Sequence, residues 1–168
     1  MKKIITLGLA VLLAAALHAQ TKGTIKIYGY KQPVSGGMVQ RTISEDGASH
    51  EVPVKPRFNY RIYTASASVI TPTEVWIRGE AFSASQSPVE TPVVYNSPNN
   101  PVTPATTLVP KTTKKVLQIS PAPLKDKGTT KARTLAKTNE LVLVYKANGR
   151  MYYQALKKLE MLEPAFLQ

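Results

Sequence analysis

The chain has 168 residues, with 22 lysines and arginines against 10 aspartates and glutamates, and a formal net charge of +12. It contains no cysteine, which excludes disulfides, thiolate metal sites and cysteine nucleophiles. Of its two histidines, His18 lies in an apolar leader and His50 in a polar stretch, so neither a catalytic triad nor a histidine-rich zinc site is expected.

The first residues have the pattern of a secretory signal peptide. Met1-Lys2-Lys3 is positive, Ile4 to Leu17 is almost wholly apolar, and His18-Ala19 precedes a polar sequence. We expect residues 1–19 to be a cleaved signal peptide and residues 20–168 to form one mostly-β domain. Because no cysteine is available for lipid attachment and no later segment is apolar for long enough to span a bilayer, we expect a periplasmic or secreted protein.

Alternating apolar and polar side chains predict strands in the first half of the chain. The expected strands are residues 24–31, 38–43, 57–67 and 73–82. A short serine-rich connection joins the last two, which we expect to be neighbours in one antiparallel sheet. Their polar faces carry charges of both signs, so cross-strand pairing is expected among Arg61, Arg78, Glu74 and Glu80.

Prolines dominate the middle of the chain, since eight of the 13 fall between Pro88 and Pro123. Proline is incompatible with helix interiors and central strands, so most of this region should be irregular. We expect a Pro- and Thr-rich loop at 96–114, and two short edge strands at 93–95 and 116–119.

The segment from Lys111 to Lys137 is strongly basic. It carries eight cationic side chains against the single acid Asp126, and residues 120–138 lack apolar periodicity, which predicts a basic flexible loop. These cations either contact a polyanion or only keep the loop soluble. The candidate polyanion contacts are Lys111, Lys114, Lys115, Lys125, Lys127, Lys131, Arg133 and Lys137.

The strongest local signal is Asn148-Gly149, which lies between two apolar runs and predicts a two-residue β-hairpin turn. The turn pairs Tyr145 with Tyr152 and makes both faces of the hairpin apolar. Either the rest of the chain covers both faces, or one face is a partner surface, whose candidate residues are Leu141, Leu143, Tyr145, Tyr152 and Leu156. Residues 155–162 could form a short helix or prolong the last strand.

Together these patterns predict an all-β fold: a small antiparallel β-sandwich of immunoglobulin-like architecture or a partly open barrel, with a long Pro-rich loop and a C-terminal β-hairpin. We expect an exported, non-enzymatic binding, accessory or structural protein of the bacterial cell envelope, acting through contacts with another envelope protein.

An alternative function is binding of anionic polysaccharide or lipid head groups by the basic segment. Nucleic acid is not an expected partner, because the segment lacks interleaved aromatic residues. A carboxylate-based hydrolase is the second alternative, although Glu74 and Glu80 would lie about 20 Å apart along one strand. No cofactor, metal or catalytic residue is expected.

Overall fold

The computed structural model describes residues 25–35, 41–43, 49–51, 57–97, 104–124 and 127–166, so the expected signal peptide lies outside the described residues. The strands are β1 (Ile25–Ser35), β2 (Arg41–Ile43), β3 (Ser49–Glu51), β4 (Arg57–Ser66), β5 (Thr71–Ile77), β6 (Glu80–Pro88), β7 (Val93–Tyr95), β8 (Thr106–Val109), β9 (Lys115–Pro123), β10 (Leu141–Ala147), β11 (Arg150–Leu156), β12 (Glu160–Met161) and β13 (Ala165–Phe166). A short helix, α2 (Thr130–Ala136), precedes β10.

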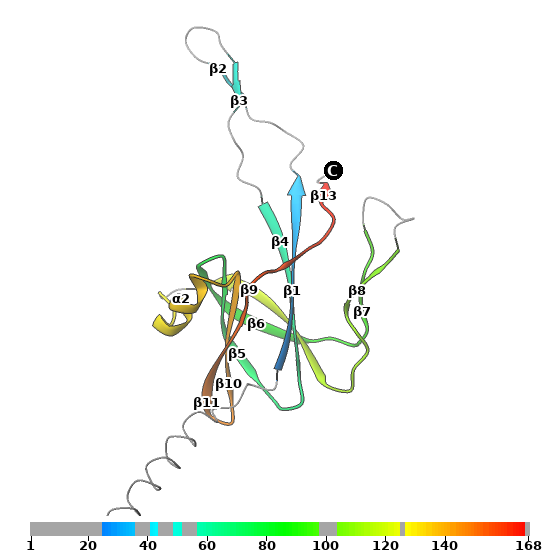
Figure 1. The fold of residues 1–168 in the computed structure, drawn as a ribbon, viewed down its shortest axis with the longest axis vertical. Helices are drawn as coiled ribbons and strands as arrows, with labels where there is room; N and C mark the ends of the chain where they lie inside the picture. Colours follow the sequence, from blue (N-terminus) through cyan, green and yellow to red (C-terminus); the bar gives the residue numbers. More distant parts are fainter. Residues whose placement is uncertain are drawn as a thin grey trace, which may run out of the picture.

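The expected all-β class is confirmed, in the form of a partly open barrel rather than a sandwich. The main sheet has the order β11-β10-β5-β6-β9-β4-β1-β12, with β13 also paired to β1, and it curls into a half-barrel (Figure 1). The pairings of β1 with β12 and β13 are parallel, so the sheet is mixed. Two small hairpins, β2–β3 and β7–β8, stand outside it.

The C-terminal hairpin is confirmed residue by residue. β10 pairs with β11 in the predicted register, from Leu141 opposite Leu156 to Ala147 opposite Arg150. Asn148 and Gly149 have φ angles of 49° and 72°, as two positive-φ positions of a tight hairpin require. Beyond Leu156 the chain does not form a helix; it crosses to β1, where Glu160 pairs with Tyr30.

The expected strand at 73–82 is two strands. Arg78 and Gly79 have positive φ angles of 52° and 86° and form a turn between β5 and β6. The expected pairing of strands 57–67 and 73–82 is also wrong, because β6 and β9 lie between β4 and β5. The predicted charge pairs therefore do not form, and Lys31 with Glu140 is the one ion pair within the described ranges.

The proline-rich region contains more strand than its composition predicts. The expected edge strand at 116–119 belongs to β9, which is a central strand between β6 and β4. Pro121 and Pro123 are tolerated because β4 pairs only with Lys115 to Ile119, and the proline-bearing end of β9 pairs with β6 alone. The strand at 93–95 is confirmed as β7, but its partner β8 lies within the expected loop 96–114.

The expected flexible loop at 120–138 contains the end of β9 and all of α2. The sequence did not predict this helix because its only buried residues are two alanines, Ala132 and Ala136, one turn apart, with Leu135 partly buried beside them. Both pack on the sheet, in a cluster with Trp76, Val142 and Val144.

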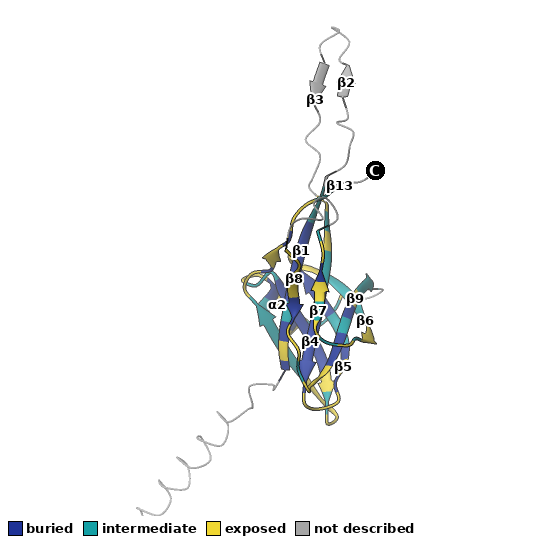
Figure 2. Ribbon diagram, turned by 90° about the vertical axis from the view of Figure 1, so that its right-hand side faces the viewer, coloured by how far each residue is buried: buried dark blue, intermediate teal, exposed yellow. Residues whose placement is uncertain are grey.

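Three apolar clusters hold the fold together, and Figure 2 shows the buried residues concentrated in the central strands. The largest fills the inside of the half-barrel and includes Ile62, Val75 and Leu143. A second joins the outer face of β1 and β4 to the β7–β8 hairpin, and a third lies under α2. Figure 1 shows α2 and the β7–β8 hairpin on opposite sides of the sheet.

Candidate functional site

The predicted partner surface on the hairpin lies inside the half-barrel. Leu141, Leu143 and Tyr145 are at most 2% exposed, and the Tyr145 ring stacks on Tyr152 with centroids 5.6 Å apart. Leu156 packs against the same cluster. The sheet curls over this face and the chain after Leu156 closes it, so Leu141, Leu143 and Tyr145 are covered within the chain, whereas Tyr152 and Leu156 are only partly buried.

The interior is closed by an anchor built on Glu140. Its carboxylate accepts hydrogen bonds from Lys31 Nζ at 2.7 and 3.0 Å and from the backbone N–H of Leu159 at 2.7 Å. The hydrogen bonds from Lys31 and then Leu159 hold the pKa of Glu140 below its usual value. Leu159, 1% exposed, is thereby held in the interior cluster.

A second carboxylate anchors α2 to the outer face. Glu74 accepts hydrogen bonds from the backbone N–H of Thr129 at 3.0 Å, from the Thr129 hydroxyl, and from Trp76 Nε1 at 3.1 Å. Burial on its own would raise the pKa of Glu74, but the hydrogen bonds from Thr129 and Trp76 outweigh burial and lower it. The side chain of Glu74 therefore holds the N-terminal end of α2 against β5.

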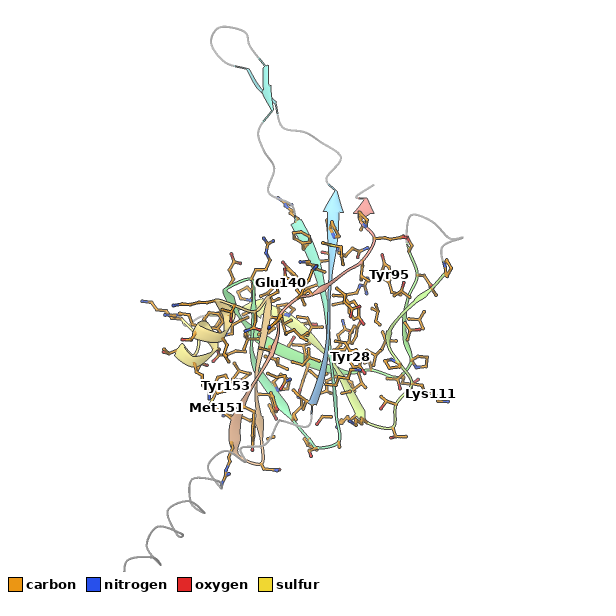
Figure 3. The ribbon with its side chains drawn as sticks, in the orientation of Figure 1. Tyr28, Tyr95, Lys111, Glu140, Met151 and Tyr153 are labelled. Carbon is orange, nitrogen blue, oxygen red and sulfur yellow. The ribbon has the colours of Figure 1, made fainter. Side chains whose placement is uncertain are left out.

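The structure divides the predicted polyanion contacts into two groups. Lys111, Lys114 and Lys115 lie at the connection from β8 to β9, whereas the second group surrounds α2 on the other side of the molecule (Figure 3). The second group consists of Lys127, Lys131, Arg133 and Lys137. Lys125 lies outside the described residues. The described cations of this run thus lie in two separate places on the molecule.

A groove follows the first half of β1, and we call it the β1 groove. Its volume is about 350 Å³, and five consecutive residues of β1 from Lys26 to Tyr30 form its floor. One wall is β8 with Pro110, and the other is the segment from Leu156 to Glu160. The volume lies within the range typical of ligand sites.

The edge of β1 that borders the β1 groove has unpaired backbone groups. The Lys31 carbonyl accepts a hydrogen bond from the Leu162 N–H on the side away from β4. Backbone groups point to alternate sides along a strand, so the N–H and C=O groups of Ile27 and Gly29 point to the same side. The parallel pairing of Tyr30 with Glu160 uses the Gly29 carbonyl on that side. Within the described part of the chain no strand pairs with the Ile27 N–H and C=O or with the Gly29 N–H, and we call these groups of β1 the open edge.

The β1 groove is mainly cationic. Lys26 and Lys158 are exposed and line it, and Lys111 follows the lining residue Pro110. Lys26 Nζ lies 4.7 Å from the centroid of the Tyr28 ring. Glu160 is the one carboxylate among the lining residues.

The β8 wall is held to the floor by a buried tyrosine. The Tyr30 hydroxyl donates a 2.6 Å hydrogen bond to the Leu108 carbonyl. Burial, and then the neighbouring Glu160, raise the pKa of Tyr30 to about 12, so the hydroxyl keeps its proton and its donor role across the physiological range. The wall is therefore a fixed part of the groove.

Alternation along the expected strand 24–31 puts Lys26, Tyr28 and Tyr30 on one face, but nothing in the sequence connects them with Lys158. Only the crossing of the chain from β11 to β12 brings the two segments together. Among the described residues, no helix combines the length and apolarity needed to cross a bilayer. Comparison with known proteins finds no matching family model, no matching curated protein and no matching solved structure.

Proposed function

We propose that the mature chain is an exported, non-enzymatic binding protein of the bacterial cell envelope that receives an extended segment of a partner protein in the β1 groove. The observation that carries this proposal is the open edge itself, because strand addition to an exposed sheet edge is a common mode of peptide recognition. The leader at residues 1–19 supports the placement in the envelope.

The main chain of β1 would supply the affinity. Ile27 presents one donor and one acceptor to the groove and Gly29 presents one donor, and residues two apart on a strand repeat about every 6.6 Å. The five floor residues would accommodate a segment of about four to five residues in extended form. The two walls would restrict this segment to lying along β1.

The charge of the groove indicates the chemistry of the partner. Lys26, Lys158 and the adjacent Lys111 favour a segment with acidic side chains, and complementary charge speeds association and selects among partners. We therefore expect an extended acidic segment of another envelope protein.

Site-specific photocrosslinking in cells tests this proposal. A photoreactive residue at Tyr28, on the groove floor, is expected to capture a protein through an acidic segment, which mass spectrometry of the adduct identifies. The matched control is Val69, which is 74% exposed and lies in the connection between β4 and β5. The adduct should be lost when Lys26→Glu and Lys158→Glu are combined. Equal labelling from Val69, or an adduct indifferent to both charge reversals, would contradict the proposal.

Hydrogen exchange of the purified complex then tests the mode of binding. The amides of Ile27 and Gly29 should become protected, while those of Lys26 and Tyr28, which face β4, should not change. Equal protection of all four amides would show that the partner binds without adding a strand.

A further inference from the structure

A second surface lies around α2, and we call it the α2 surface. It consists of Lys127, Lys131, Arg133, Lys137, Met151 and Tyr153. Figure 3 shows Tyr153 and Met151 below the helix, on the side of the molecule away from Lys111. This surface is separate from the β1 groove, so the inference does not depend on the proposed function.

Two cations of the α2 surface, Lys131 and Arg133, contact aromatic rings of the sheet. Lys131 Nζ lies 4.8 Å from the centroid of the Tyr153 ring, on one flank of the helix. On the other flank the Arg133 guanidinium lies 5.9 Å from the Trp76 ring and donates a 2.7 Å hydrogen bond to the Lys127 carbonyl. Positive charge therefore borders the helix on both sides.

Little negative charge opposes these cations. Residues 127–139 contain no aspartate or glutamate, nor does β11. The neighbouring Glu74 carboxylate accepts its hydrogen bonds from neutral groups of Thr129 and Trp76 and keeps its negative charge, and Asp126 lies outside the described residues. The four cations outnumber the Glu74 carboxylate, so this surface keeps a net positive charge.

Apolar surface adjoins the cations. Met151 is 44% exposed and lies opposite Lys146, on the same face of the hairpin as Tyr153, which is partly buried. A membrane surface offers phosphates to lysines and a boundary region that accepts tyrosine and methionine, whereas a soluble polysaccharide has no apolar interior to take up a methionine side chain. We infer that the α2 surface binds anionic phospholipid head groups and docks the folded domain on a membrane.

Co-sedimentation of residues 20–168 with vesicles tests this inference. The vesicles contain phosphatidylglycerol mixed with phosphatidylcholine, with pure phosphatidylcholine for comparison. The test variant combines Lys127→Gln, Lys131→Gln and Lys137→Gln. The matched control combines Lys111→Gln, Lys114→Gln and Lys115→Gln, which removes the same charge from the opposite side of the molecule.

We expect the test variant to lose affinity for the anionic vesicles on the order of a hundredfold, and the control to change by only a few-fold. Circular dichroism and thermal melting confirm that both variants fold. Equal losses in the two variants would show that net charge alone attracts the protein, and absence of binding by the unaltered chain would overturn the inference outright.

Met151→Gln separates a lipid surface from a soluble polyanion, because it removes the apolar side chain without changing the charge. We expect it to weaken vesicle binding while leaving retention on dextran sulfate beads nearly unchanged, because only the lipid contact uses the thioether. Vesicle binding that is insensitive to Met151→Gln would replace the lipid assignment with a purely electrostatic polyanion site.

Discussion

The two faces of β10 are buried in different ways. The interior face, with Leu141, Leu143 and Tyr145, is covered by the curled sheet itself and by Leu159. The outer face, with Val142 and Val144, is covered by a seven-residue helix that is not part of the sheet. Each cover is anchored by one carboxylate, Glu140 for the interior and Glu74 for the helix.

This difference indicates how each face should respond to damage. The interior cover comes from strands spread over the whole chain, so weakening it should destabilise the entire domain. The outer cover is a short local segment, which can detach in a sub-global opening while the sheet stays folded.

Leu143→Ala tests the interior cover. Leu143 is fully buried, so we expect a loss of about 2–5 kcal/mol in the free energy of unfolding, from lost burial and the cavity left behind. Urea denaturation measures it. Leu135→Ala makes the same chemical change on the partly buried helix and should cost clearly less. Similar losses of unfolding free energy in the two variants would show that the interior face and the helix-covered face of β10 do not differ in this way.

Glu140→Gln tests the interior anchor, where it removes charge-assisted hydrogen bonds to Lys31 and Leu159. We expect a loss of about 1.5–3 kcal/mol at neutral pH. The folded-state pKa of Glu140 is lowered, so its contribution is present above the unfolded pKa near 4.5 and is lost as the pH falls below that value. The stability of the unaltered chain should therefore approach that of the variant on acidification, and a constant gap would argue against this anchor.

Glu74→Gln tests the outer anchor, where it weakens the bonds to Thr129 and Trp76. We expect a loss of about 1–2 kcal/mol, expressed mainly as faster hydrogen exchange in α2 with little change at Ile62 and Val75 inside the half-barrel. Nuclear magnetic resonance resolves the two regions. Uniformly faster exchange would mean that the helix and the sheet open together.

Lys131→Gln gives the smallest expected effect. It removes the contact between the Lys131 ammonium and the Tyr153 ring, which at an exposed position contributes about 0.5–1 kcal/mol. Lys114→Gln, at an exposed position of the β8–β9 connection, is the control. A loss at Lys131 no larger than at Lys114 would show that the cation–π contact does not stabilise the helix.

The hairpin at Asn148-Gly149 could be predicted in full because a tight turn determines the register of the strands that follow it. The strand at 57–67 could also be predicted, since alternation reports which side chains are buried. Alternation does not identify neighbours, however, and for this reason the pairing of 57–67 with 73–82 was wrong. Helix α2 was missed because its only buried residues are two alanines. Their small apolar side chains produce no recognisable helical repeat of apolar residues in the sequence.

Only part of the β1 groove could be predicted from the sequence. Lys26 and Tyr28 were recognisable as one face of a strand, but nothing near them in sequence predicts the wall made by Leu156 to Glu160. For the predicted partner surface the sequence left two alternatives, because an apolar face is equally compatible with a docking site and with a core. The curl of the sheet buries Leu141, Leu143 and Tyr145, while Tyr152 and Leu156 stay partly exposed.

Patterns in the sequence were enough to predict the β class, the C-terminal hairpin with its register, and the uneven distribution of charge, because each depends on residues close together in the chain. The tertiary structure alone decided the strand order, the docking of α2, the division of the basic segment and the groove beside β1. Those features depend on which distant segments share a buried face, and many strand orders can bury the same alternating side chains equally well.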